Sequence, residues 1–161
     1  MAFLRKTIEW MVEKLKMAGA LCLVSMMALT CVDVVGRLFR HPIFGSVEIV
    51  GFLATMSVAM ALPYTHKIDG HVGVELVVRL LSKKTQLIID LITRLLSLAL
   101  FMLATWRLAV YAHTLQASGE VSMNLEFPEY TVVYVVAFCS LVFSLVIGQD
   151  VVTYIKELKK K

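Results

Sequence analysis

The chain has 161 residues, of which 59% are hydrophobic and only 17% are charged, and its mean hydropathy is +0.80. A soluble domain is usually about 45–50% apolar and about 25% charged. The composition therefore excludes a disordered chain, a disulfide-rich secreted module and a soluble nucleic-acid binder, and it predicts a protein whose partner is the lipid bilayer.

The first sixteen residues show helical periodicity. Apolar residues recur at Leu4, Ile8, Met11 and Leu15, and charged residues fill the opposite side. This pattern predicts a short amphipathic helix over 1–16, lying on the membrane surface. The alternative is an extension of the first span beyond the membrane, and the pattern favours neither.

Four stretches of the chain are long and almost free of charge. A helix rises about 1.5 Å per residue, so about 20 residues cross a hydrocarbon core of about 30 Å. The fourth stretch is the cleanest, whereas the third includes Asp90, Arg94 and Arg107 near its ends. We predict an all-α, four-helix integral membrane protein that forms a single domain over 1–161. The expected spans are 17–39, 47–65, 87–111 and 130–150.

The second span carries several local signals. Ser46 is placed to cap the helix, and Pro63 is expected to kink or end it. Gly51, Thr55 and Ala59 follow one another at four-residue spacing. Such a stripe of small residues lets helix backbones approach closely in lipid, so we expect it to be a helix-packing surface.

Further along, residues 72–84 place four apolar side chains on one side and three basic ones on another, which predicts a second short interfacial helix.

The distribution of Lys and Arg predicts the orientation in the membrane, since these residues favour the cytoplasmic side. Residues 1–16, the segment 66–86 and the tail after Asp150 each hold four of them. The segment 112–129 holds none. Both termini and the middle loop are therefore expected in the cytoplasm, although Arg37 and Arg40 lie close to the first outer connection. The outer loop 112–129 carries three acidic residues: Glu120, Glu126 and Glu129.

Charged residues near the span ends are spaced for ion pairs. Asp33 and Arg37 lie four residues apart, and Asp90 and Arg94 repeat this spacing. The short turn after the first span also brings Arg37 or Arg40 within reach of Glu48. We expect these pairs to be structural or to contact a partner subunit, rather than to relay protons.

The sequence predicts no enzyme, no metal and no cofactor. The histidines His41, His66, His71 and His113 all lie at span ends or in loops, where they cannot act as paired axial ligands of a haem inside a bundle. The spacing of His66, His71 and Glu75 matches no strong metal-ligand motif. No nucleophile motif, zinc-protease motif or phosphate-binding glycine loop is found.

Several motifs, in their order along the chain, resemble a known family. They are the run Asp33–Arg37 at the end of the first span, the segment 41–48 with its Gly-Ser-x-Glu start to the second span, the segment 70–76 with His71, and Ser122–Pro128 before the fourth span. Together they resemble the small membrane subunit of tripartite ATP-independent periplasmic (TRAP) transporters. The resemblance covers nearly the whole chain.

This resemblance implies an assembly of three parts in a bacterial inner membrane. A soluble periplasmic protein captures an organic carboxylate, such as sialic acid or a C4-dicarboxylate, and a large permease subunit moves it inward by sodium symport. The small subunit would support the large one as a scaffold, and Glu120, Glu126 and Glu129 are possible docking residues for the binding protein. Two alternatives stay open: the membrane anchor of a respiratory redox complex, and a self-sufficient small transporter.

Overall fold

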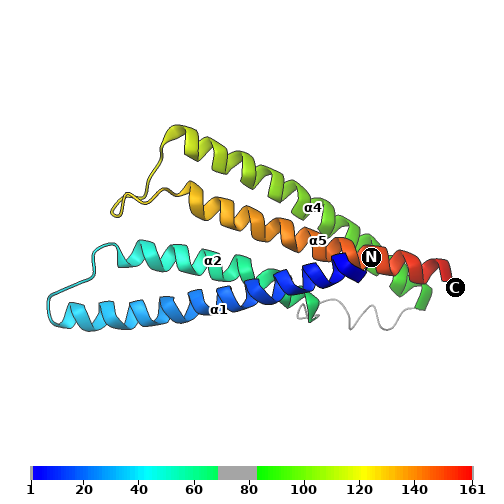
Figure 1. The fold of residues 1–161 in the computed structure, drawn as a ribbon, viewed down its shortest axis with the longest axis horizontal. Coiled ribbons are helices and arrows are strands. Elements are labelled where there is room, and N and C mark those ends of the chain that lie inside the picture. Colours follow the sequence, from blue (N-terminus) through cyan, green and yellow to red (C-terminus); the bar gives the residue numbers. More distant parts are fainter. Residues whose placement is uncertain (1, 69–82, 161) are drawn as a thin grey trace.

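The computed structural model describes residues 2–68 and 83–160, and these form four helices (Figure 1). The helices are α1 (Ala2–Leu38), α2 (Ser46–Lys67), α4 (Lys83–Ser118) and α5 (Tyr130–Lys160). Each contains a segment that is long and apolar enough to cross a membrane. The predicted all-α, four-helix membrane fold is therefore confirmed.

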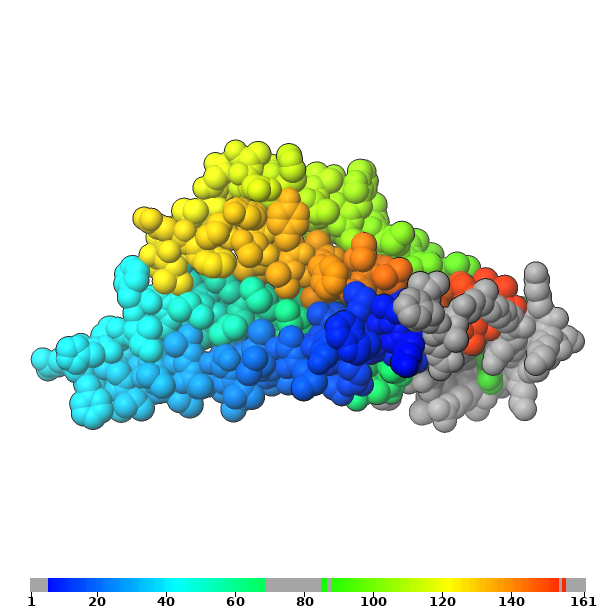
Figure 2. All heavy atoms as spheres, viewed as in Figure 1, coloured from blue at the N-terminus to red at the C-terminus, as the bar shows by residue number. Residues whose placement is uncertain are grey.

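The helices form two hairpins, α1 with α2 and α4 with α5, which pack together mainly through α2 and α5 (Figure 1). Both chain termini lie at one end of the elongated body, which we call the terminal end. The connections 39–45 and 119–129 lie at the other end, which we call the loop end (Figures 1 and 2). Helix α4 lies at the edge of the arrangement and packs chiefly on α5.

Helix α1 runs without a break from Ala2 to Leu38. Its N-terminal apolar stripe, including Ile8 and Leu15, packs around Val12 onto Val142 and Val146 of α5. Val12 is buried, Ile8 and Leu15 are half-buried, and α1 continues through residue 16, so the structure has no separate short helix over 1–16. Of the two alternatives, the continuous extension of the first span matches the structure. The predicted interfacial helix over 72–84 lies, up to residue 82, outside the described residues.

Helix α2 differs from the prediction at both of its ends. It continues through Pro63, which is fully buried, and ends at Lys67. Its N-cap is Gly45 and not Ser46, and no side chain caps the helix by a hydrogen bond. Glu48 lies in the first turn, as predicted.

Helix α4 extends well past the predicted end at residue 111. Ala112 and Leu115 are buried, so the added turns continue to pack. The helix ends where Gly119 adopts φ 71° and its N–H donates to the Leu115 carbonyl at 3.1 Å, an arrangement that glycine adopts without steric cost. The outer connection therefore shrinks from 112–129 to 119–129, and Arg107 lies well inside its helix.

Helix α5 forms the centre of the bundle. Half of the most hydrophobic 18-residue window of α5 is buried inside the protein, whereas none of the corresponding window of α4 is. Phe143, Ile147 and Val151 of α5 form a core cluster with Leu62 of α2. Three residues of α4 complete this cluster: Leu91, Leu98 and Phe101.

A close approach between α1 and α2 uses a glycine that the sequence pattern did not single out. A Cβ at Gly19 would lie 3.1 Å from the Met60 Cβ and 3.3 Å from the Ser57 carbonyl oxygen, and the Ser57 hydroxyl donates to the Gly19 carbonyl at 3.1 Å. In the predicted stripe, by contrast, Gly51 has nothing within 4 Å of an added Cβ. Thr55 is exposed and donates to the Gly51 carbonyl, and Ala59 alone of the three is buried.

We expect Gly19→Val to destabilise the isolated protein by about 1–3 kcal/mol, because the added atoms overlap the α2 backbone. Gly51→Val is the matched control, since it adds the same atoms where there is open space. Thermal unfolding in detergent measures both variants. Equal losses for the two would contradict the close approach at Gly19.

Candidate functional site

The polar side chains of the bundle gather at its two ends. We call the group around Asp33 and Glu48 the loop-end network. The group formed by His66, Arg94 and Asp150 we call the terminal-end clamp. Each joins segments that are far apart in the sequence, so each bears on whether the two hairpins move as one body.

Asp33 organises the first half of the loop-end network. It is only 7% exposed, and its Oδ2 accepts a hydrogen bond from Arg37 Nε at 2.8 Å. The other oxygen, Oδ1, accepts from the Ile43 backbone N–H at 2.9 Å, and the buried Ser46 hydroxyl also faces this carboxylate. The ion pair expected from the four-residue spacing is therefore present. It also fixes the connection 39–45 to the end of α1.

Glu48 forms the second half, with partners that differ from those predicted. Its Oε1 accepts from the backbone N–H and the side-chain Nδ2 of Asn124, at 2.9 and 2.7 Å. Its Oε2 accepts from the Leu125 N–H at 3.1 Å. The expected partner Arg37 is turned to Asp33 instead. Glu48 thus ties the start of α2 to the connection between α4 and α5.

Apolar contacts hold the same two segments together. Gly45 adopts φ 70°, and a Cβ added there would lie 2.5 Å from Leu125 Cγ. The position therefore requires glycine both for its backbone angle and for the space that Leu125 occupies. Nearby, the rings of Phe52 and Phe127 lie 5.5 Å apart between centroids.

The connection 119–129 has an ordered internal structure built around Ser122, which is buried. The Ser122 N–H donates to the Phe127 carbonyl at 2.9 Å, and its hydroxyl accepts from the Phe127 N–H at 3.2 Å. Of the three predicted docking residues, Glu120 and Glu126 are exposed, and Glu129 is half-buried. Met123, at 98% exposure, projects fully into the surroundings.

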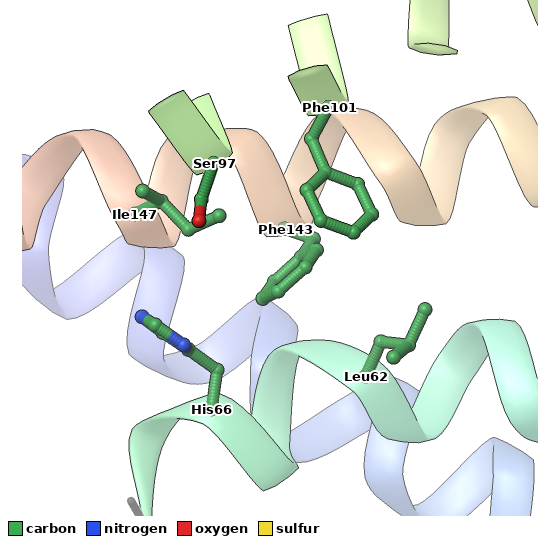
Figure 3. Close-up of a pocket in the computed structure, with 6 residues that line it drawn as sticks. All are labelled: Leu62, His66, Ser97, Phe101, Phe143 and Ile147. Atoms are coloured by element: carbon green, nitrogen blue, oxygen red, sulfur yellow. The ribbon is translucent and has the colours of Figure 1, made fainter. Parts of the chain in front are cut away.

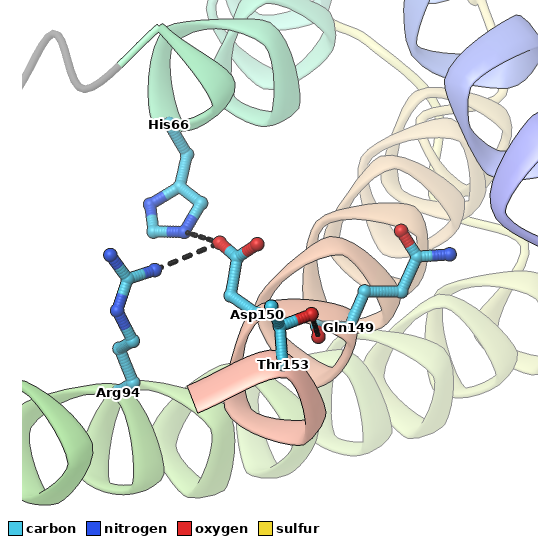
Figure 4. A network of polar contacts seen from close by, with 5 residues as sticks. All are labelled: His66, Arg94, Gln149, Asp150 and Thr153. Atoms are coloured by element: carbon cyan, nitrogen blue, oxygen red, sulfur yellow. Dashed lines mark hydrogen bonds and ion pairs between the residues drawn. The ribbon is translucent and has the colours of Figure 1, made fainter. Parts of the chain in front are cut away.

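The terminal-end clamp joins three helices through one carboxylate oxygen (Figure 4). Asp150 Oδ2 on α5 accepts from Arg94 Nη1 on α4 at 2.8 Å and lies 3.0 Å from His66 Nε2 on α2. The His66 ring also meets Phe143 edge to face at 5.4 Å. The predicted ion pair between Asp90 and Arg94 is not formed, because Arg94 reaches across to the neighbouring helix instead.

Helix α1 is joined to this end by Lys16. Its Nζ lies 4.3 Å from the centre of the Tyr64 ring on α2 and 2.8 Å from Glu13 Oε2 on its own helix. A cation over an aromatic ring is attracted to its electron-rich face. All four helices thus have a polar contact with a neighbour near the terminal end.

Two hollows lie beside these contacts. One, of about 230 Å³, sits next to the clamp between α2, α4 and α5 and is lined by Leu62, His66, Ser97, Phe101, Phe143 and Ile147 (Figure 3). The other, of about 460 Å³, is a shallow groove lined by Ala54, Thr55, Val58, Ala59, Leu62 and Val136. Both are mainly apolar, and the described residues contain no cluster of three or more possible metal ligands. The arrangement can brace helices against one another, and His66 is the one titratable side chain among those that line the two hollows.

Sequence reasoning missed four side chains of these networks: His66, Asp150, Asn124 and Ser122. Asp150 is a lone acid at the end of the cleanest uncharged run, and that isolation was a usable signal. Asn124 and Ser122 lie in a segment that carries the family resemblance, but their residue types do not indicate these contacts, since their role depends on the fold of the connection. His71, predicted as part of a structural or interface site, lies outside the described residues.

Comparison with known protein families identifies the chain. A model of the family "Tripartite ATP-independent periplasmic transporters, DctQ component" matches residues 26–157. That range holds Asp33, Glu48, Arg94 and Asp150, and so both polar networks. No curated protein and no solved structure matches. The chain therefore belongs to the DctQ family, the small component of TRAP transporters, and is a part of a transporter and not an enzyme.

Proposed function

We propose that this chain is the stationary scaffold subunit of a sodium-coupled importer of organic carboxylates, of the sialic acid or C4-dicarboxylate class. It would bind the large permease subunit in the bacterial inner membrane, and a periplasmic binding protein would deliver the substrate. The family match supports the general role, and the resemblance noted in the sequence supports the substrate class.

The observation that carries the scaffold role is that the two hairpins are joined at both ends. Glu48 holds the α4–α5 connection at the loop end, and Asp150 joins three helices at the terminal end. A transport domain that moves through the membrane needs a frame that does not move with it. Four helices tied at both rims resist the splaying and tilting that such movement would impose.

The charge distribution supports an orientation with both termini in the cytoplasm. The terminal end carries the basic residues of the first helix and of the C-terminal tail, while the connection 119–129 contains no Lys or Arg. Positive charge favours the cytoplasmic side. The loop-end network would then face the periplasm.

The two alternatives fit the described geometry less well. A haem anchor needs histidines that face one another inside the bundle, whereas His66 is engaged with Asp150 and Phe143. A self-sufficient transporter of carboxylates needs a polar or cationic cavity at depth, whereas both hollows have mainly apolar linings.

The scaffold role is tested by co-expressing the tagged chain with the large permease subunit of the same transporter. We expect the two to co-purify, and the pair, but neither subunit alone, to support carboxylate uptake into proteoliposomes when a sodium gradient and the binding protein are supplied. A tagged chain that purifies alone, or a large subunit that transports fully without it, would contradict the proposal.

We also propose that the connection 119–129 contributes to docking of the periplasmic binding protein. Its internal hydrogen bonds and the Glu48 contacts give it a fixed shape, on which Glu120 and Glu126 are exposed beside Met123. A fixed acidic surface can select a partner with a basic patch and speed its association at low salt.

For this docking surface, we expect the paired change Glu120→Lys and Glu126→Lys to reduce uptake several-fold at low salt, with a smaller loss at high salt because ions screen the repulsion. Glu157→Lys, in the C-terminal part of α5, is the control, since it reverses an acid far from the loop. Unchanged uptake and unchanged salt dependence in the paired variant would count against docking.

A further inference from the structure

Helix α4 is the least covered of the four helices. Its main contact is with α5 alone, and none of its most hydrophobic window is buried. Large apolar side chains, including Leu100, Leu103 and Trp106, are each more than half exposed. If this face were wholly apolar, contact with lipid alone would account for its exposure.

Arg107 interrupts this face. It is exposed and lies within the membrane-spanning segment Ile88–Ser118. Arg37 and Arg94, the other arginines described within spans, each form an ion pair inside the chain. Among the described residues, none forms an ion pair or hydrogen bond with the Arg107 side chain.

The depth of Arg107 follows from the contacts between α4 and α5. Arg94 meets Asp150, and the Phe101 ring meets the Phe143 ring edge to face at 4.4 Å between centroids, so the antiparallel register places Arg107 level with Ala137. That level is about 10 Å along the helix from Tyr130, where α5 begins. Arg107 therefore lies well below the loop-end rim of the span.

The direction of α4 makes the loop-end rim of the span harder for the Arg107 side chain to reach. Side chains on a helix tilt toward its N-terminus, and the N-terminus of α4 is at the terminal end. Arg107 thus leans toward the middle of the bilayer and away from the loop-end headgroups. An arginine left in hydrocarbon is costly, so this position calls for a partner with negative charge.

We propose that the exposed face of α4 around Leu103, Trp106 and Arg107 is the surface that binds the large permease subunit, which supplies a carboxylate to pair with Arg107. Arginine and tryptophan are the side chains most often found as buried anchors of protein interfaces, and here they are neighbours. This assignment rests on the scaffold role proposed above and adds which face is used and which chemistry meets it.

Three substitutions at Arg107 separate the large subunit from lipid as the occupant. If lipid covers this face, Arg107→Leu removes a costly charge and leaves the complex intact. If a carboxylate of the large subunit pairs with Arg107, the same change leaves that carboxylate buried without a partner. We then expect about tenfold less large subunit to be recovered with the tagged chain. Arg107→Glu should lose at least as much, and Arg107→Lys should keep most of the binding.

As a control for folding, thermal unfolding of each variant of this chain alone is measured in detergent. Arg107→Leu should be at least as stable as the original. A photo-crosslinking residue at position 103, in membranes containing the whole transporter, should attach to the large subunit. The matched position is Leu21 on α1, at the opposite edge, which is 67% exposed and should attach to it far less.

The inference is overturned if Arg107→Leu co-purifies with the large subunit as well as the original does. It is equally overturned if position 103 attaches only to lipid or to a second copy of this chain, or if Leu21 attaches and position 103 does not. Failure of the original chain to co-purify at all is a separate result, because it removes the scaffold role itself.

Discussion

Charged groups within the spans of this protein need partners, because hydrocarbon solvates neither a carboxylate nor a guanidinium. Most of the architecture follows from how this need is met. Asp33 accepts hydrogen bonds from Arg37 and from a backbone N–H. Glu48 accepts three hydrogen bonds from the connection between α4 and α5. Asp150 pairs with Arg94 and His66. All three acids lie near the ends of their membrane-spanning segments, so pairing them also ties the helices together at the rims.

Between these ends the bundle is held by apolar packing on α5, and there the two hairpins are less tightly joined. The core clusters around Val142 and Ile147 lie toward the terminal end, while a shallow apolar groove separates α2 from α5 at the level of Ala59 and Val136. Apolar side chains gain little by meeting one another in lipid, so polar contacts carry more of the specificity here than in a soluble bundle. A helical bundle with polar contacts at both ends and an apolar surface between them can keep a fixed position in the membrane. Such a bundle suits a frame beside which a neighbouring subunit moves.

The number and order of the spans could be predicted because a helix that crosses the bilayer needs a long run without charge, and such runs can be found in the sequence. The pair Asp33–Arg37 could also be predicted, since four-residue spacing on one helix is local information. The partners of Glu48 and Arg94 could not, because they depend on how separate helices and connections are placed against one another. The stripe at Gly51 shows why: small residues permit a close approach without saying which helix approaches, and the structure places that contact at Gly19. Whether residues 1–16 continue the first span or form a separate surface helix could not be decided from the sequence, because both have the same amphipathic periodicity.

A double-mutant cycle on His66→Phe and Asp150→Asn tests most directly whether polar pairing across the two hairpins holds this body together, because these residues join α2 to α5. The free energy of unfolding is measured for the two single variants, the double variant and the original in the same lipid or detergent mixture. We expect the double variant to be more stable than the sum of the single losses implies, with a coupling of about 1 kcal/mol or more. Losses that add within about 0.3 kcal/mol would show that the two residues act independently, and would contradict this pairing.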